Sequence, residues 1–473
     1  MSTLDSRREA NRLLGALEVT SWRPLGVITA CVGIALATAL VPEHAGLNPA
    51  ARWALFIVVL AAGLWVTEAI PAYAVAMLVI GLEIAILGRE GGVFATDEHT
   101  WKIFVEPWGS PLIWLFFGGF VLARGIQTSG LDRWFSAVVL RRFGTRPSRV
   151  LLGAMAVTFG FSMFASNTAT TTMMVAVLSP VVASLRDDPL AKGLLLGVPF
   201  AANIGGMATL IGTPPNAIAA GLLTDVDPIG FARWMALGLP PAALLLFIAW
   251  AFLLRRCPPR TRAVDLASLG TSVDSRLPAW RRLLVLATFV ITIGMWLSEP
   301  LHGVPTPVVA FVPLTVFTVS GVLTSSDIRS LQWDVLLLLA GGLALGIGVS
   351  ETGLADWLVS KLPTDDASPL VLAVIFAMTA MLLSNFMSNT AAANVIIPMG
   401  LALAVGSEAF VVVPIAFGAS LAMCLPVSTP PNAIAYSTGQ LDARDFLVGG
   451  VLIGVVGLAI SIAWSQVALR WIV

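Results

Sequence analysis

Long apolar stretches recur along the whole chain, and they predict its structure. The clearest of them span residues 24–42, 53–88, 231–254, 281–298, 305–323, 334–350 and 446–469. A helix of about 20 apolar residues can cross the hydrocarbon core of a bilayer, and it satisfies its own backbone hydrogen bonds. The pattern therefore predicts an all-α polytopic membrane protein.

Polar strings interrupt this apolar pattern twice in each half of the chain. "SMFASNTATTTMMV" (162–175) is matched 222 residues later by "SNFMSNTAAANVII" (384–397). "TLIGTPPNAIAAGLLT" (209–224) is matched by "LPVSTPPNAIAYSTGQL" (425–441) at an offset of 216 residues. Matched strings in the same order indicate an internal duplication.

A third pair belongs to the same duplication. "WLFFGGFVLARGIQTSGLDRW" (114–134) corresponds to "LLLLAGGLALGIGVSETGLADW" (336–357), at an offset of 223 residues. Each segment contains a double glycine, at 118–119 and at 341–342, which we interpret as a position of close helix packing.

The duplication predicts an inverted architecture. If 150–186 and 367–405 are re-entrant hairpins, each half has an odd number of crossings, and about eleven spans result in all. Inverted halves are typical of secondary transporters, which bind their substrate near the membrane midplane between the repeats. Broken helices are predicted at 190–224 and 410–440.

Paired prolines lie inside both broken helices, at Pro214, Pro215, Pro430 and Pro431. Proline removes a backbone donor and clashes with the preceding turn, so it interrupts a helix. Non-helical backbone at membrane depth is tolerated only inside protein or beside a water-filled cavity. The free N–H groups at such a break favour an anion, and its carbonyls can bind a cation.

The serine, asparagine and threonine residues of the strings have two interpretations. A single group of this kind usually forms hydrogen bonds between membrane helices. Two matched strings, each followed by a matched Thr-Pro-Pro-Asn, favour a binding site instead. Hydroxyl and amide oxygens suit small hard cations, whereas transition metals prefer histidine or cysteine.

Composition agrees with a membrane protein and narrows its chemistry. Hydrophobic residues make up 57% of the chain and charged residues 11%, against about 45–50% and about 25% in soluble domains. The three cysteines lack metal-site spacing, and the three histidines lie in loops or at the ends of apolar stretches. We see no paired aspartates or Ser/His dyad within the spans, and we expect neither an enzyme nor a nucleic-acid partner.

Arginines cluster at three places, and positive charge favours the cytoplasmic side. The clusters are Arg7, Arg8, Arg12 and Arg23; Arg133, Arg141, Arg142, Arg146 and Arg149; and Arg255, Arg256, Arg260 and Arg262. The N-terminal segment 1–23 and the loop 255–280, which separates the halves 24–254 and 281–473, are therefore predicted to be cytoplasmic. The C-terminus would lie outside the inner (plasma) membrane.

The duplicated Ser-Asn-Thr strings, "IGTPPNAIA" and "LPVSTPPNAIAYSTGQL" resemble the divalent anion/sodium symporter family of dicarboxylate, citrate and sulfate carriers. The resemblance covers the chain from about residue 50. It implies eleven spans with two re-entrant hairpins, a homodimer in the lipid bilayer, and an elevator-like movement of a transport domain against a fixed scaffold.

The resemblance also implies a site with at least two sodium ions. The first ion would contact Ser162, Ser166, Asn167 and the backbone at Gly212, and the second Ser384, Asn389 and the backbone at Met387 and Ser428. Substrate carboxylates would meet Asn167, Thr168, Thr213, Asn389, Thr390 and Thr429. Ser384 stands where some relatives have threonine, and Met387 where a small residue is common.

Electrostatics explains why such a site would need sodium. None of the four strings contains lysine or arginine, and neutral groups alone offset a dianion poorly in a low-dielectric pocket. Bound sodium would supply the charge, so the affinity for the anion should depend on sodium.

We expect sodium-coupled symport of divalent organic anions, with C4-dicarboxylates such as succinate, malate or fumarate preferred. The alternatives are a sodium-driven citrate or sulfate carrier, and a sodium-independent dicarboxylate exchanger of the same fold.

Overall fold

A computed structural model describes residues 22–472 except 41–45, 186–187, 225, 268, 270–276 and 362–367. Most of the predicted N-terminal segment, with Arg7, Arg8 and Arg12, lies outside the described residues, as do Val473 and part of the loop 255–280.

Every regular element in the described residues is a helix, as predicted. Six of these helices are long and apolar enough to cross a membrane. They are α3 (Pro49–Thr67), α5 (Pro111–Ser129), α11 (Phe231–Arg256), α12 (Ala279–Leu297), α17 (Trp333–Glu351) and α23 (Ala443–Ile472). The total of eleven spans stays a prediction.

The other helices include α2 (Trp22–Leu40), which has 19 residues like α3, and a series of shorter ones. In chain order the shorter ones are α4 (Ala72–Leu82), η1 (Glu83–Gly88), η2 (Thr100–Phe104), η3 (Glu106–Gly109), α6 (Leu131–Arg142), α7 (Pro147–Ser162), α8 (Asn167–Ser184), α9 (Pro189–Gly206), α10 (Pro214–Leu222), α13 (Glu299–His302), α14 (Thr306–Val309), α15 (Phe311–Val319), α16 (Ser325–Arg329), α18 (Leu354–Lys361), α19 (Pro369–Ser384), α20 (Asn389–Leu403), α21 (Glu408–Ser420) and α22 (Pro430–Tyr436). The apolar stretch 53–88 is divided between α3 and α4, because Glu68 adopts a left-handed conformation (φ 48°) and Pro71 precedes α4.

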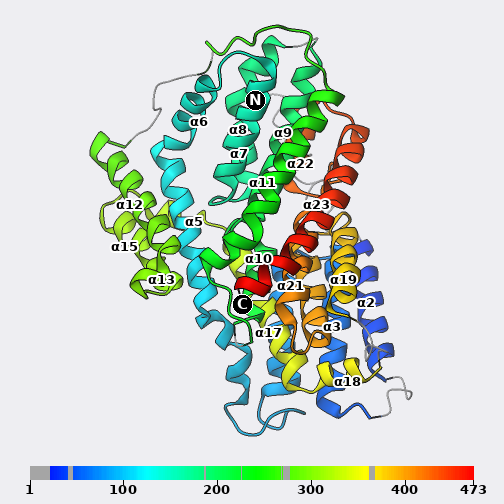
Figure 1. Cartoon of the computed structure of the whole chain (residues 1–473). Coiled ribbons are helices and arrows are strands. Elements are labelled where there is room, and N and C mark those ends of the chain that lie inside the picture. The colour runs from blue at the N-terminus through cyan, green and yellow to red at the C-terminus, as the bar shows by residue number, and fades with distance from the viewer. Residues whose placement is uncertain are drawn as a thin grey trace, which may run out of the picture.

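The two halves contain the same series of elements. A long helix (α5 or α17) leads to a short helix (α6 or α18), a helical pair (α7–α8 or α19–α20), two helices separated by a non-helical segment (α9–α10 or α21–α22), and a long last helix (α11 or α23). Figure 1 shows α7 and α8 in the upper half of the molecule and α19 in the lower half.

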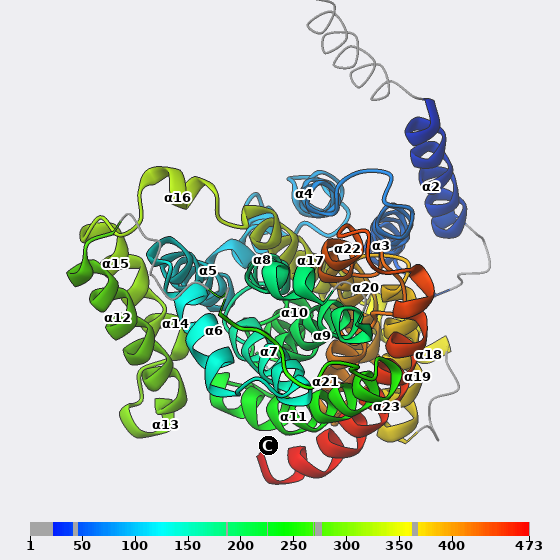
Figure 2. The ribbon, with the colours of Figure 1, turned by 90° about the horizontal axis from the view of Figure 1, so that it is seen from above.

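The two series are packed into each other. Within each half, α9 packs on α7 and α8, and α21 packs on α19 and α20. Across the halves, α10 packs on α20 and α21, while α22 packs on α8 and α9. Each short helix therefore contacts the helical pair of the other half, so the polar strings of both halves meet. Seen from above, α7–α10 lie in the middle, with α12 and α15 at one edge and α2 at another (Figure 2).

The double glycines lie where helices approach closely, as predicted. A Cβ added to Gly118 would lie 2.6 Å from the Cβ of Ala310, and one added to Gly341 would lie 2.4 Å from the Cβ of Ala76. Because real Cβ atoms do not approach so closely, only glycine fits at these crossings, and membrane helices use small residues for such contacts.

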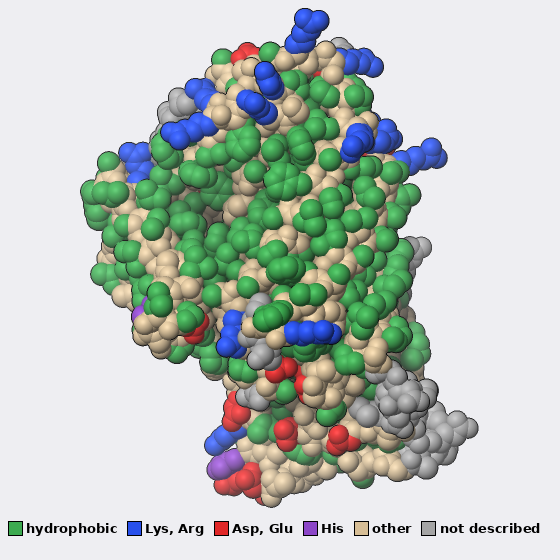
Figure 3. Space-filling view, in the orientation of Figure 1, with side chains coloured by type: hydrophobic (Ala, Val, Ile, Leu, Met, Phe, Trp, Pro, Cys, Tyr) green, Lys and Arg blue, Asp and Glu red, His purple; other side chains and the backbone are tan. Residues whose placement is uncertain are grey.

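The surface is divided into bands. Hydrophobic side chains cover the broad middle of the face in Figure 3, Lys and Arg gather at its upper end, and Asp, Glu and His are concentrated at its lower end. An apolar belt between charged ends is the surface that a membrane-spanning protein presents to lipid.

Candidate functional site

The polar strings of both halves line one cavity of about 480 Å³. All six residues predicted to meet substrate carboxylates lie on its wall. They are Asn167, Thr168, Thr213, Asn389, Thr390 and Thr429. Of the predicted sodium ligands, Ser166, Asn167, Gly212, Asn389 and Ser428 also line the cavity. Ser162, Ser384 and Met387 are buried and do not line it.

Each string ends one helix of a pair and starts the next. Ser166 is the N-cap of α8 and accepts a hydrogen bond from Ala169 N at 3.2 Å, and Ser388 is the N-cap of α20 and accepts one from Ala391 N at 3.2 Å. Serine is favoured at this position because its oxygen satisfies a free backbone donor. The caps place Asn167 and Asn389 as the first residues of α8 and α20, at the positive ends of the two helices.

In the first half, three oxygen atoms lie close together and share a single hydroxyl proton. Ser162 Oγ lies 2.6 Å from Asn167 Oδ1 and 2.7 Å from the carbonyl of Ala202. A serine hydroxyl carries one proton and can donate to only one of these acceptors at a time. The Nδ2 of Asn167 lies 3.5 Å from Asn203 Oδ1, so the asparagine is fixed at both ends. Three clustered oxygens with one proton form a good environment for a small cation.

In the second half, two of the predicted ligand oxygens have no partner among the described residues. Ser384 Oγ and Asn389 Oδ1 are buried and form no hydrogen bond with the described residues. Ser428 Oγ lies 3.1 Å from both the carbonyl and the Oδ1 of Asn385, and it accepts a hydrogen bond from Leu425 N at 3.0 Å. Buried polar atoms without partners are rare in folded proteins and call for an explanation such as a bound ion.

The helix breaks lie before the prolines, which corrects the prediction that the prolines themselves interrupt the helices. Residues 207–213 and 421–429 are not helical, and each proline pair opens the following helix, α10 or α22. Proline suits the first helical position because its fixed φ is helical and its missing N–H is not needed there.

The asparagines of the Thr-Pro-Pro-Asn strings stabilise these breaks. Asn216 Nδ2 donates to the carbonyl of Thr209 at 2.7 Å, and Asn432 Nδ2 donates to the carbonyls of Leu425 at 2.9 Å and Met423 at 3.0 Å. Both asparagines are fully buried. They hold the non-helical backbone in place and do not line the cavity.

Several lining residues do not belong to the strings. Asn203 is buried in α9 and donates to Thr429 Oγ1 at 3.1 Å, which joins the two halves beside Asn167. A polar residue in the apolar run "VPFAANIGG" is a signal that could have indicated it. Tyr73, Gln332 and Asp334 also face the cavity, together with Phe116 and Phe120. No Lys or Arg is among the lining residues, and Asp334 is their one charged side chain.

Comparison with known proteins agrees with this geometry. Residues 58–411 match a family model, CitMHS, that is described as a citrate transporter. The sodium-dependent dicarboxylate transporter SdcS of Staphylococcus saprophyticus is 29% identical over 442 residues, covering 84% of this chain and 82% of the relative. SdcS of Staphylococcus aureus is 30% identical over 437 residues, with the same coverage.

Two solved structures share the fold. The YdaH transporter of Alcanivorax borkumensis superposes with a TM-score of 0.55 at 16% identity, over 84% of this chain and 96% of that one. MtrF of Neisseria gonorrhoeae, described as an antimetabolite efflux pump, gives a TM-score of 0.53 at 13% identity, over 84% and 94%. The family match covers most of the chain, so the protein is a multi-span secondary transporter and not an enzyme, and it belongs to the citrate-transporter family, of the divalent anion/sodium symporter type.

Proposed function

We propose that the protein is a sodium-coupled symporter of divalent organic anions, with C4-dicarboxylates such as succinate, malate or fumarate as substrates. The observation that carries this proposal is the cavity shared by both Ser-Asn-Thr strings, whose lining residues include no Lys or Arg. Neutral hydroxyls and amides compensate a dianion poorly in a low-dielectric site. Sodium ions beside Asn167 and Asn389 would supply the missing charge, so that each ligand raises the affinity for the other.

Two sodium ions would bind at the two clusters of oxygens on and beside the cavity wall. The first would bind between Ser162, Ser166, Asn167 and the backbone at Gly212, where one proton is shared among several oxygens. The second would satisfy the unpartnered oxygens of Ser384 and Asn389, with help from Ser428 and the backbone at Met387.

The anion would bind in the cavity between these ions. Its carboxylates would meet the Thr168, Thr213, Thr390 and Thr429 side chains and the N-terminal turns of α8 and α20, which favour negative charge. Each carboxylate would then lie between a helix end and a sodium ion. The asparagines, which touch both positions, would couple one ligand to the other.

Transport would follow an elevator mechanism. The crossed packing of α7–α11 with α19–α23 supports one moving body, and α2–α5 and α12–α17 would form the scaffold of a homodimer. Phe164, within the first string, contacts Phe289 of α12 at 5.8 Å between ring centroids. Cysteines introduced by Phe164→Cys and Phe289→Cys, once oxidised to a disulfide, should arrest uptake, and reduction should restore it. Full uptake by the cross-linked protein would rule out sliding at this contact.

The proposed orientation of the chain in the membrane rests on the arginine clusters, which are predicted to be cytoplasmic together with the loop 255–280. The proposed topology has eleven spans, two re-entrant hairpins and an external C-terminus in the inner (plasma) membrane. Reaction of single cysteines in 257–267 and after Val473 with an impermeant maleimide tests it. Labelling of the loop in intact cells would contradict this orientation.

Uptake into proteoliposomes is the decisive experiment for symport. Because serine and asparagine oxygens form both proposed cation sites, succinate uptake should rise steeply with external sodium, and neither potassium nor choline should replace it. Equal uptake in all three salts would favour the sodium-independent exchanger.

Citrate is the second candidate substrate, because the matching family model is described as a citrate transporter. Competition by succinate, citrate and sulfate in the same assay separates the candidates. Stronger inhibition by citrate or sulfate than by succinate would overturn the C4-dicarboxylate assignment.

A further inference from the structure

A second, much smaller cavity lies between α6 and α8. It has a volume of about 20 Å³ and is lined by residues of α5, α6, the α7–α8 pair and α12. None of its lining residues is shared with the large cavity. A cavity of this size holds one water-sized particle.

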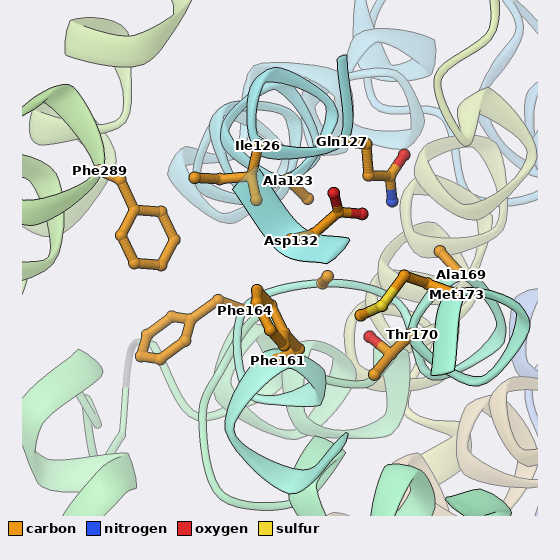
Figure 4. A pocket seen from close by; sticks show the side chains of 11 residues that line it. Ala123, Ile126, Gln127, Asp132, Phe161, Phe164, Ala169, Thr170, Met173 and Phe289 are labelled. Carbon is orange, nitrogen blue, oxygen red and sulfur yellow. The ribbon is translucent and has the colours of Figure 1, made fainter. Parts of the chain in front are cut away.

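The walls of this cavity contain polar groups without partners. Asp132 is 7% exposed, and its Oδ1 is buried with no hydrogen bond to the described residues. Thr170 is 2% exposed, and its Oγ1 also has no partner there. In Figure 4 the Asp132 carboxylate is turned toward Gln127, and the Thr170 hydroxyl lies across the pocket beside Met173. Polar side chains from three helices, α5, α6 and α8, therefore line one small space.

The position of Asp132 in its helix explains only part of this arrangement. Asp132 lies in the first turn of α6, where the helix dipole stabilises a carboxylate by about 0.3–1 kcal/mol. The backbone N–H of Arg133 donates to the carboxylate and the exposed Arg133 side chain attracts it from a distance, but no described Lys or Arg forms an ion pair with it. A buried carboxylate without a counter-ion is strongly unfavourable, and the dipole leaves the Thr170 hydroxyl unsatisfied as well.

We propose that this cavity binds a sodium ion, separate from the two ions of the large cavity, through the oxygens of Asp132 and Thr170. The choice of sodium rests on the proposed function. A cation between these oxygens would satisfy the carboxylate and the hydroxyl together, and it would supply the positive charge that a water molecule lacks. The aligned position in the second half is Ala355, so this site exists once per chain.

The location of the ion gives it a role in transport. Thr170 lies one turn beyond Ser166 on α8, so an ion here would fasten α6 to the helix that begins with Asn167. Phe164 of the α7–α8 turn and Phe289 of α12 also line the cavity and contact each other in a T-shaped pair. If α12 belongs to the scaffold, as proposed, the ion lies at the boundary between the moving and fixed bodies.

The test is the number of sodium ions bound per protomer of the purified full-length protein, measured with radioactive sodium at equilibrium. Asp132→Asn and Thr170→Val, which nearly preserve shape, should each bind one ion fewer than the wild type. Asp356→Asn is the matched control, because Asp356 occupies the first turn of the corresponding helix α18 and is exposed. Succinate binding at saturating sodium should persist in all three variants, since none of these residues lines the large cavity.

An unchanged sodium count in Asp132→Asn would overturn the inference. The same would follow if the only effect of Asp132→Asn were to remove a pH dependence of uptake, since the pocket would then hold a proton and water. Should Asp132→Asn fail to fold, Thr170→Val gives the same comparison. A wild-type protein that binds no sodium would instead refute the proposed function itself, so the two failures are distinguishable.

Discussion

Replacing Asn389 with alanine is expected to remove most sodium-dependent anion binding, and Asn167→Ala should do the same. Each amide lies at a helix N-terminus on the cavity wall, where it would touch both a sodium ion and the substrate. A lost polar partner in a buried site costs about 1–3 kcal/mol, which weakens binding about five- to 150-fold. The measurement is succinate binding to the purified protein across a sodium titration.

The two variants should differ in melting temperature when neither sodium nor substrate is bound. Asn167 Oδ1 accepts a hydrogen bond from Ser162, whereas Asn389 Oδ1 has no partner among the described residues. Asn389→Ala should therefore leave the melting temperature of the sodium-free protein nearly unchanged, while Asn167→Ala should lower it. In both variants the stabilisation that sodium gives the wild type should shrink, because a ligand stabilises only the state that binds it.

Thr379→Ala is the control for these variants. Thr379 is half-buried on α19, and its hydroxyl donates to the carbonyl of Ile375 within the helix, away from the cavity. Wild-type sodium-dependent binding in Asn389→Ala, with loss in Asn167→Ala alone, would contradict the two-fold site. Only the first half would then carry the chemistry.

The sequence predicts the strings of this site well because their local structure is encoded locally. A serine followed by Asn-Thr at the start of an apolar helix is an N-cap signal, and both strings form that cap. The constant offset of the duplication then implies that the second string has the same structure as the first. Pairing of the strings in one cavity required only that the halves pack together.

Other features depend on tertiary packing and could not be read from the chain. Gln332 directly precedes α17, Asp334 lies in its first turn, and Tyr73 lies in α4. None of the three belongs to a matched string, yet all face the cavity. The sequence also treats Ser162 and Ser384 as equivalent. In the folded protein Ser162 lies within hydrogen-bonding distance of two acceptors and Ser384 of none, because the helices around them differ.

The halves also differ at Gly206, the last residue of α9. Gly206→Ala is expected to disable the first proposed sodium site. A Cβ at this position would lie 2.6 Å from Asn167 Oδ1 and 2.9 Å from its Nδ2. The asparagine would have to move, and its contact with Ser162 would break. The aligned residue in the second half is Ala422, so the requirement for glycine belongs to the first half. We expect sodium-dependent succinate binding to fall about tenfold or more, corresponding to the loss of at least one buried polar contact.

A double-mutant cycle separates this effect from a general packing defect. Once Asn167→Ala has removed the side chain that the new methyl group would strike, adding Gly206→Ala should weaken binding little further. Strong non-additivity of this kind is the signature of residues in direct contact. Gly160→Ala is the matched control, because a Cβ on that glycine of α7 would meet nothing within 4 Å, and its binding should stay at the wild-type level. Additive losses from Gly206→Ala and Asn167→Ala would instead mean that Gly206 acts on the fold of α9 and not through the asparagine.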